Sequence, residues 1–178
     1  MDSEAIRRAI MSATAYLSAH PDEARYADSP AVAVLEDGLR CRVSGAAGEV
    51  LATDMPSSVG GDGTAPSPGW FLRAAEASCV ATLIAMRSAV LGADVGSVSV
   101  TVDSESDDRG ILGLDASTPA GPLAGRVLIT FFGGSAPEPL LHEIATWAFD
   151  HCPVTDAVRR AIPLELRMED RRSPARFF

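Results

Sequence analysis

Cysteines are the residues of this 178-residue chain best suited to chemistry, and two of them stand in helix-like sequence. Cys79 lies in the apolar run AAEASCVATLIAM, residues 74–86, three residues after Glu76. Cys152 precedes Pro153, where a second helix should stop. One fixed thiol and one mobile thiol at a helix end suit a peroxide-reducing dithiol, in which one sulfur becomes a sulfenic acid and the other condenses with it. The spacing alone fits two core cysteines as well, because a free buried cysteine usually behaves as a small hydrophobic residue.

Cys41 and two histidines are weaker candidates for chemistry. Cys41 occupies an inward position in the alternating segment GLRCRVSG, residues 38–45, so we expect it to pack inside a strand. His142 with Glu143, and His151 beside the last cysteine, match no zinc-ligand spacing, and exposed helix positions explain both histidines better. The sequence therefore predicts no metal site.

Composition and charge limit the class of protein and its partners. The chain is 47% apolar and 22% charged, as ordinary globular domains are. Its formal net charge of −9 repels phosphate backbones, so nucleic acid is not an expected partner. The start shows no signal-peptide pattern, and the apolar stretch 70–91 contains Arg73, Glu76 and Arg87, which are costly in lipid. We expect a cytoplasmic protein with no membrane partner.

The first half of the chain must position the first of these cysteines. Residues 4–18 have helical periodicity, and short strands are expected between 30 and 53. A loop rich in glycine and proline follows at 57–69. Pro68 is well placed to begin a long helix that ends near residue 91, where Gly92 can stop it. This helix is apolar on most of its circumference, so it should be a central element covered on several sides.

The second half must position the other cysteine. Three segments have the alternation or the turns of strands: 97–105, 110–117 and 125–132. Ser135 and Glu138 form a capping-box pattern for a second helix at about 137–151. Residues 163–169 alternate like a last strand. Hairpins around two long helices predict an α+β protein with an antiparallel sheet.

Three segments taken together resemble the OsmC/Ohr family, whose members are osmotically inducible protein C and the organic hydroperoxide resistance proteins. They are GGDGTAPSPGWFLRAAEASCVATLIAM (60–86), DDRGILGLD (107–115) and HEIATWAFDHCPVTDAV (142–158). The family shows a glycine-rich loop, a proline-initiated helix with a cysteine three turns in, and a second cysteine before a Pro-Val or similar pair. The resemblance covers about residues 31–169.

The resemblance implies an α+β, OsmC-like fold, in which an antiparallel β-sheet wraps around long central helices in an intertwined homodimer. Both active sites would lie near the dimer interface. The chain then divides into an added N-terminal helical segment (1–28), an OsmC-like domain (29–170) and a C-terminal tail (171–178). A homodimer also agrees with a central helix that has almost no polar face for solvent.

For the site, the resemblance implies a thiol-dependent peroxidase that reduces organic hydroperoxides. Cys79 matches the peroxidatic cysteine and Cys152 the resolving one. An external dithiol would reduce the resulting disulfide. No bound cofactor is needed, because sulfur carries the electrons.

Two features of the sequence concern activation of the thiolate: a missing glutamate and the choice of its arginine partner. The glutamate that follows the helix-initiating proline in the hydroperoxide-resistance branch is Gly69 here. The arginine that pairs with that glutamate matches Arg40, with Arg42 as the second choice, and a solvated strand face explains both about equally well. Glu76 stands one turn before Cys79 and helps only if it fixes an arginine, since an unpaired carboxylate raises the pKa of a nearby thiol.

Two other functions stay open on the sequence. The main alternative is a redox-inactive OsmC-fold protein that binds an apolar small molecule at the dimer interface, which the loss of the glutamate at Gly69 favours. A third class is a structural interaction protein that acts through the helix at 4–18. Retention of both cysteines favours the enzyme.

Overall fold

The fold mixes helices with antiparallel strands, which confirms the α+β class. The computed structural model describes residues 3–169, so the tail expected at 171–178 lies outside the described residues. The elements are α1 (Ser3–Ala19), the 3-10 turn η1 (Pro21–Ala24), β1 (Ala31–Asp37), β2 (Arg40–Gly45), β3 (Val50–Thr53), the 3-10 turn η2 (Ser57–Val59), α2 (Pro68–Leu91), β4 (Ser97–Glu105), α3 (Asp108–Ile111), β5 (Ala124–Phe132), α4 (Glu138–Asp150) and α5 (Pro153–Arg159).

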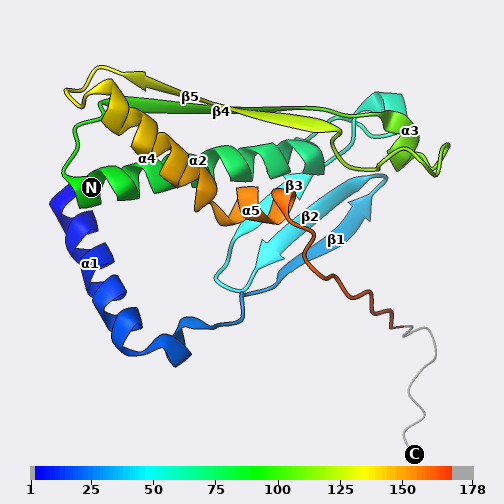
Figure 1. The fold of residues 1–178 in the computed structure, drawn as a ribbon. Coiled ribbons are helices and arrows are strands. Elements are labelled where there is room, and N and C mark those ends of the chain that lie inside the picture. The colour runs from blue at the N-terminus through cyan, green and yellow to red at the C-terminus, as the bar shows by residue number, and fades with distance from the viewer. Residues whose placement is uncertain (1–2, 170–178) are drawn as a thin grey trace, which may run out of the picture.

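Two separate antiparallel sheets form within the chain. One has three strands in the order β1-β2-β3, and the other is the hairpin of β4 and β5. In the hairpin Val98 lies opposite Phe131 and Val100 opposite Ile129, so the apolar residues of both strands share one face. Figure 1 shows this hairpin running along α2 while α4 crosses the same helix. The hairpin, α2 and α4 together enclose the core.

The long helix α2 begins and ends where the sequence predicts. Ser67 is its N-cap and accepts a hydrogen bond from the Trp70 backbone N–H at 3.3 Å. Pro68 occupies the first turn, where its missing N–H costs nothing. Gly92 ends the helix in the left-handed conformation, with φ of 65°. These local signals fix the helix that carries Cys79.

Within one chain, α2 is covered on a single face. Its buried positions follow successive helical turns: Glu76, Val80, Ile84 and Ser88, with Ala89 beside them. The expectation that several sides of α2 are covered is therefore met only in part, since Trp70 and Leu72 remain 48% and 39% exposed. The contacts that α2 does make are with α1, α4, α5 and β4.

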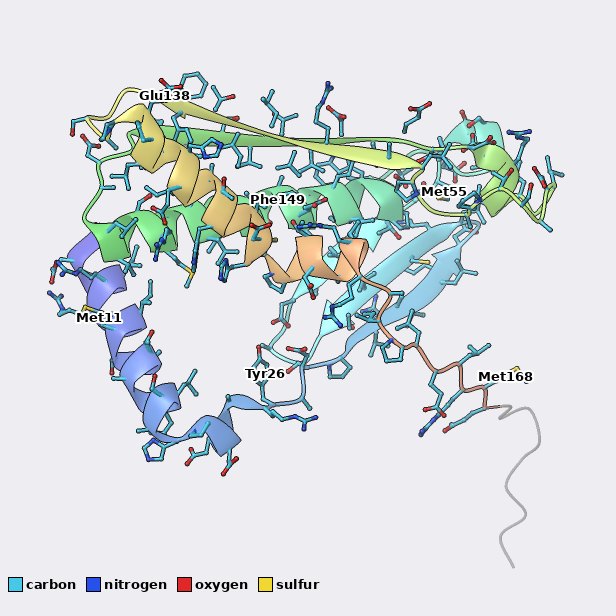
Figure 2. All side chains as sticks on the ribbon, viewed as in Figure 1. Met11, Tyr26, Met55, Glu138, Phe149 and Met168 are labelled. Carbon is cyan, nitrogen blue, oxygen red and sulfur yellow. The ribbon has the colours of Figure 1, made fainter. Side chains whose placement is uncertain are left out.

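Much of the apolar surface of the chain is exposed to solvent. It exposes 13307 Å², whereas a compact monomer of 18.6 kDa exposes about 8,200 Å². Every residue of β1 is exposed, and so are residues 11–19 of α1. Figure 2 shows Met11, Tyr26 and Met168 lying outside the packed part of the molecule, in keeping with their exposure.

The segment 110–117 is not a strand, which corrects the sequence prediction. It holds the end of the short helix α3 and a turn. Asp107 caps α3 by accepting a hydrogen bond from the Arg109 backbone N–H at 3.0 Å, and Gly113 follows with φ of 64°. An aspartate cap and a glycine in the left-handed region stabilise a helical turn and interrupt any strand.

Two further predictions at the C-terminal side are wrong. Residues 163–169 form no regular element, and their apolar side chains are almost fully exposed, because no neighbouring strand pairs with them. The expected capping box is also absent: Pro137 is the N-cap of α4, with no side-chain hydrogen bond. Ser135 instead donates its hydroxyl to Asp94 at 3.1 Å.

By length and composition α2 is also apolar enough to cross a membrane, which is weak evidence because core helices pass the same test. Its charged side chains have partners inside the protein: Arg73 donates to Ser104, Glu76 accepts from Thr155, and Arg87 pairs with Glu143. We therefore interpret α2 as a core helix. The cytoplasmic location stays a prediction.

Candidate functional site

The structure brings Cys79 and Cys152 together across 72 intervening residues. Cys79 lies on α2 and is half-buried, whereas Cys152 follows α4 and is fully buried. The two thiols lie close enough that each shifts the pKa of the other, and the Val154 backbone N–H acts to lower the pKa of both. All three cysteines of the chain are free thiols. Two adjacent free thiols on separate helices have the arrangement that a reversible disulfide requires.

Local sequence places Cys152 between two helices. α4 ends at Asp150, and Pro153 begins α5. Cys152 is the N-cap of α5, and its sulfur accepts a hydrogen bond from the Thr155 backbone N–H at 3.4 Å. The position at a helix break agrees with the sequence. The expected mobility has no counterpart here, because this thiol is 0% exposed and caps the next helix.

Different surroundings push the pKa values of the two thiols apart. Burial raises the pKa of Cys79, and the neighbouring Cys152 thiol adds to that rise. Burial also acts to raise the pKa of Cys152, but the Thr155 side chain and backbone N–H outweigh it and lower the pKa. Within one chain, Cys152 therefore ionises more readily than Cys79. A peroxidatic role for Cys79 requires a cation in addition.

Glu76 has Thr155 as its partner rather than an arginine. Its carboxylate is only 9% exposed and accepts a hydrogen bond from Thr155 Oγ1 at 3.0 Å. Thr155 itself is 1% exposed. The sequence analysis did not identify Thr155. Its place three residues after Cys152 could have predicted that its backbone N–H donates to the Cys152 side chain at the N-cap. No local pattern indicates its contact with Glu76.

The two candidate arginines lie at the first sheet. Arg40 Nη1 donates to Thr64 Oγ1 at 2.8 Å and lies 3.7 Å from Glu36, which also pairs with Arg42 at 3.1 Å. Thr64 in turn donates to Asp54, a carboxylate that is 2% exposed. Arg40 is thus bonded to the glycine-rich loop that leads into α2. Among residues 3–169, no hydrogen bond or ion pair joins either arginine to Cys79 or Cys152.

The position of the missing glutamate lies beside a different cation. A Cβ atom on Gly69 would lie 3.8 Å from Arg73 Nη1. Arg73 stands one turn later on α2 and donates to Ser104 of β4 at 3.2 Å. The spacing of four residues on a helix is the signal that could have indicated this neighbour.

Among residues 3–169, no hydrogen bond joins the side chain of a remaining candidate to the thiol pair. Cys41 is half-buried in β2, where it pairs with Leu35 and Thr53 in neighbouring strands. His151 stacks on Trp147. In the described part of the chain, no group of three or more His, Cys, Asp or Glu side chains could hold a metal ion.

One known protein family matches the part of the chain that carries both thiols. The OsmC family, described as OsmC-like protein, matches residues 61–167. A search of the curated proteins gave no match.

Solved structures share the fold at low sequence identity. An organic hydroperoxide resistance protein OsmC from Legionella pneumophila is 22% identical, with a TM-score of 0.58 over 76% of this chain and 91% of that chain. An OsmC-like protein from Mycoplasma pneumoniae is 11% identical, with a TM-score of 0.64 over 76% and 89%. An organic hydroperoxide resistance protein from Elizabethkingia anophelis is 15% identical, with a TM-score of 0.58 over 76% and 91%. At these identities the likeness establishes the fold alone.

Proposed function

The chain belongs to the family of OsmC-like proteins, and we propose that it is a thiol-dependent peroxidase that reduces organic hydroperoxides through Cys79 and Cys152. The observation that carries the proposal is the proximity of these two free thiols, one on α2 and the other at the start of α5, where each shifts the pKa of the other. Two of the structures with this fold are named organic hydroperoxide resistance proteins, which supports the same chemistry.

In the proposed reaction, electrons pass from the thiols to the peroxide. The Cys79 thiolate attacks a peroxide oxygen, the O–O bond breaks, and the alkoxide leaves as an alcohol after taking a proton. Cys79 is then a sulfenic acid. The Cys152 sulfur attacks the Cys79 sulfur, so that an S–S bond forms, the S–O bond breaks and water leaves. An external dithiol reduces the disulfide by two exchanges, and no bound cofactor takes part.

A direct experiment tests this function. Reduced protein is mixed with one equivalent of cumene hydroperoxide, and free thiols and intact mass are followed with time. The expected result is loss of two thiols and two hydrogens per chain. Unchanged thiols would contradict the peroxidase.

We propose that Arg40 supplies the cation that the Cys79 thiolate needs. Its guanidinium already contacts the loop preceding α2 through Thr64. Loss of a close positive charge raises a thiol pKa, so Arg40→Ala should raise the pKa of Cys79 by about 1 to 3. The reaction with peroxide at neutral pH should then slow ~10-fold or more. The measurement is the rate of iodoacetamide alkylation of Cys79 against pH.

Arg42→Ala is the matched control for Arg40→Ala. Both arginines pair with Glu36, but only Arg40 reaches the loop. Arg42→Ala should therefore leave the alkylation profile nearly unchanged. Unchanged profiles in both variants would remove both arginines from the mechanism, and a shift only in Arg42→Ala would exchange their roles.

We also propose that the protein is an obligate homodimer. Each chain exposes about 5,100 Å² more than a compact monomer, which is ample for an obligate interface that buries roughly 2,000–5,000 Å² in total over both partners. Light scattering at micromolar concentration should give twice the chain mass of 18.6 kDa. A stable, well-folded monomer would contradict this.

A chain that lacks the N-terminal segment is the comparison for the light-scattering measurement. We propose that residues 1–28 are an addition to an OsmC-like domain at 29–170, since the family match begins only at residue 61 and α1 is exposed over its second half. A chain lacking residues 1–28 should still dimerise. Loss of the dimer would instead favour the interaction protein that acts through α1.

One observation supports the binding protein as a second candidate. A pocket of about 240 Å³ lies over the first sheet, and neither Cys79 nor Cys152 lines it. Its lining is mainly apolar and includes Pro30, Val43 and Leu51. A mainly apolar pocket that the thiols do not line suits a small-molecule ligand. A parent protein whose Cys79 has an ordinary thiol pKa and does not react with hydroperoxide would favour this function.

A further inference from the structure

Three buried polar residues lie in contact between α2 and α5: Glu76, Thr155 and Cys152. Their exposed fractions are 9%, 1% and 0%. Thr155 Oγ1 donates to Glu76 Oε1 at 3.0 Å, and the Thr155 backbone N–H donates to Cys152 Sγ at 3.4 Å. The Thr155 side chain also interacts with the Cys152 sulfur and lowers its pKa. While the hydroxyl proton is donated to Glu76, Thr155 Oγ1 can only accept from the Cys152 S–H. One hydroxyl therefore lies between a carboxylate and a sulfur that must lose a proton in the proposed reaction.

A hydrogen bond that only holds α5 against α2 does not require a carboxylate at position 76. Glu76 occupies the buried face of α2, in line with Val80 and Ile84. Burying a carboxylate costs much more free energy than burying a neutral amide or an apolar side chain. A neutral side chain could fasten α5 to α2 at lower cost, so the carboxylate points to a chemical role.

We propose that Glu76 accepts the proton of Cys152 when Cys152 attacks oxidised Cys79, and that the Thr155 hydroxyl passes the proton between them. The proposal rests on the peroxidase function proposed above. Thr155 touches the reacting sulfur and is the catalytic residue of this step. Glu76 acts through Thr155 and is its positioning residue.

The step balances in atoms and electrons. As the S–S bond forms, the proton of Cys152 moves to Thr155 Oγ1, while the original hydroxyl proton of Thr155 moves to Glu76 Oε1. The S–O bond of the Cys79 sulfenic acid breaks, and its oxygen leaves as water after taking a proton that Glu76 returns to the site. The Cys152 sulfur is oxidised and the Cys79 sulfur is reduced, so no further oxidant is needed.

Several ionisable groups on the elements packed around these three residues have their own partners, and Glu138 and His142 also stand on α4. Arg73 is bonded to Ser104, Arg87 to Glu143, Asp103 to Arg126, Asp150 to Arg159 and Asp156 to Arg160. Cys79 is the titratable group in contact with Cys152. His151 precedes Cys152 and stacks on Trp147. His151→Asn therefore belongs in the experiment as a control for the pH profile.

The experiment separates formation of the sulfenic acid from its resolution. Reduced protein reacts with one equivalent of cumene hydroperoxide, is quenched with dimedone at increasing times, and is analysed by intact mass between pH 5 and pH 9. In Glu76→Gln the first step should be unchanged, because the amide keeps the hydrogen bond to Thr155. The second step should slow by about 10-fold or more at neutral pH, since an amide cannot take the proton. The defect should shrink as pH rises, because hydroxide then deprotonates Cys152.

Matched variants keep the proposal falsifiable. Thr155→Val should reproduce the pH-dependent defect, and Thr155→Ser should restore the rate, whether or not Glu76→Gln folds. Glu143→Gln removes a carboxylate from α4, away from the thiols, and should leave both steps unchanged. Parental rates in Glu76→Gln, or a slowing equal at every pH, would overturn the relay. A Thr155→Ser variant as slow as Thr155→Val would overturn it too, because the hydroxyl would then contribute nothing.

A second oxidant distinguishes failure of the relay from failure of the peroxidase. Diamide in solution reaches Cys79, because Cys152 is 0% exposed. It forms an adduct on the Cys79 sulfur, and Cys152 then displaces it to give the same disulfide. If the parent protein does not react with cumene hydroperoxide, the peroxidase proposal fails, and diamide still measures attack by Cys152. A rate with diamide that does not depend on Glu76 would then overturn the relay as well.

Discussion

Replacing Cys152 by serine is expected to trap Cys79 as a sulfenic acid and to abolish peroxide turnover. The two thiols contact each other and no other cysteine, so no thiol remains in the site to condense with oxidised Cys79. Excess peroxide should then carry Cys79 on to the sulfinic and sulfonic acids. The measurement is intact mass with dimedone trapping, together with consumption of cumene hydroperoxide in the presence of dithiothreitol.

Two further serine variants complete this prediction. Cys79→Ser should leave Cys152 reduced and consume no peroxide, because the sulfur that reacts first is missing. Cys41→Ser is the matched control: Cys41 lies in β2, among strand neighbours, and its loss should leave turnover unchanged. Peptide mapping that placed Cys41 in the disulfide would refute the assignment. If peroxide oxidised Cys152 in Cys79→Ser, the roles of the two cysteines would be exchanged. The lower pKa of Cys152 in the single chain would favour that outcome.

Gly96→Ala is expected to destabilise the protein by about 2–5 kcal/mol. Gly96 has φ of 66°, a conformation that an L side chain rarely adopts. A Cβ there would lie 2.3 Å from the backbone oxygen of Phe132, and 2.7 Å from backbone atoms of Gly133 and Gly134. Backbone atoms of a neighbouring strand cannot move away cheaply. The close approach lets the start of β4 pair with the end of β5.

Gly92→Ala is the matched control for Gly96→Ala. Gly92 has nearly the same φ, 65°, but a Cβ on it meets nothing within 4 Å. It should therefore cost only the left-handed strain, about 1–2 kcal/mol. The measurement is urea unfolding at one fixed protein concentration, because unfolding of a dimer depends on concentration. Equal losses in the two variants would show that the close approach to β5 contributes nothing.

Local sequence determined the elements that carry the two thiols. Pro68 and Gly92 predicted both ends of α2, because a fixed φ and a left-handed φ act within one or two residues of the chain. Pro153 predicted the break at Cys152 for the same reason. The alternating segments 97–105 and 125–132 predicted the hairpin, since the period of a strand is written in its own residues. The resemblance to the family followed from residues 60–86, 107–115 and 142–158.

The alternation of apolar residues predicted strands wrongly where the result depended on a pairing partner. Residues 163–169 alternate like a strand, yet no strand in the described part of the chain pairs with them. Residues 110–117 follow an aspartate cap that outweighs their apolar pattern. A strand exists only through its hydrogen bonds to a neighbour, and the residues of the segment do not show whether that neighbour is present.

Only the tertiary structure decided the surroundings of the thiols. The contact of Cys79 with Cys152, the bond of Thr155 to Glu76, and the bond of Arg40 to Thr64 all join segments that are 24 or more residues apart. Burial and these hydrogen bonds set the pKa values of the two thiols in opposite directions. Residue types and spacing predict which groups can react. The proton affinity of each group depends on the atoms that packing places around it, and those atoms come from distant parts of the chain.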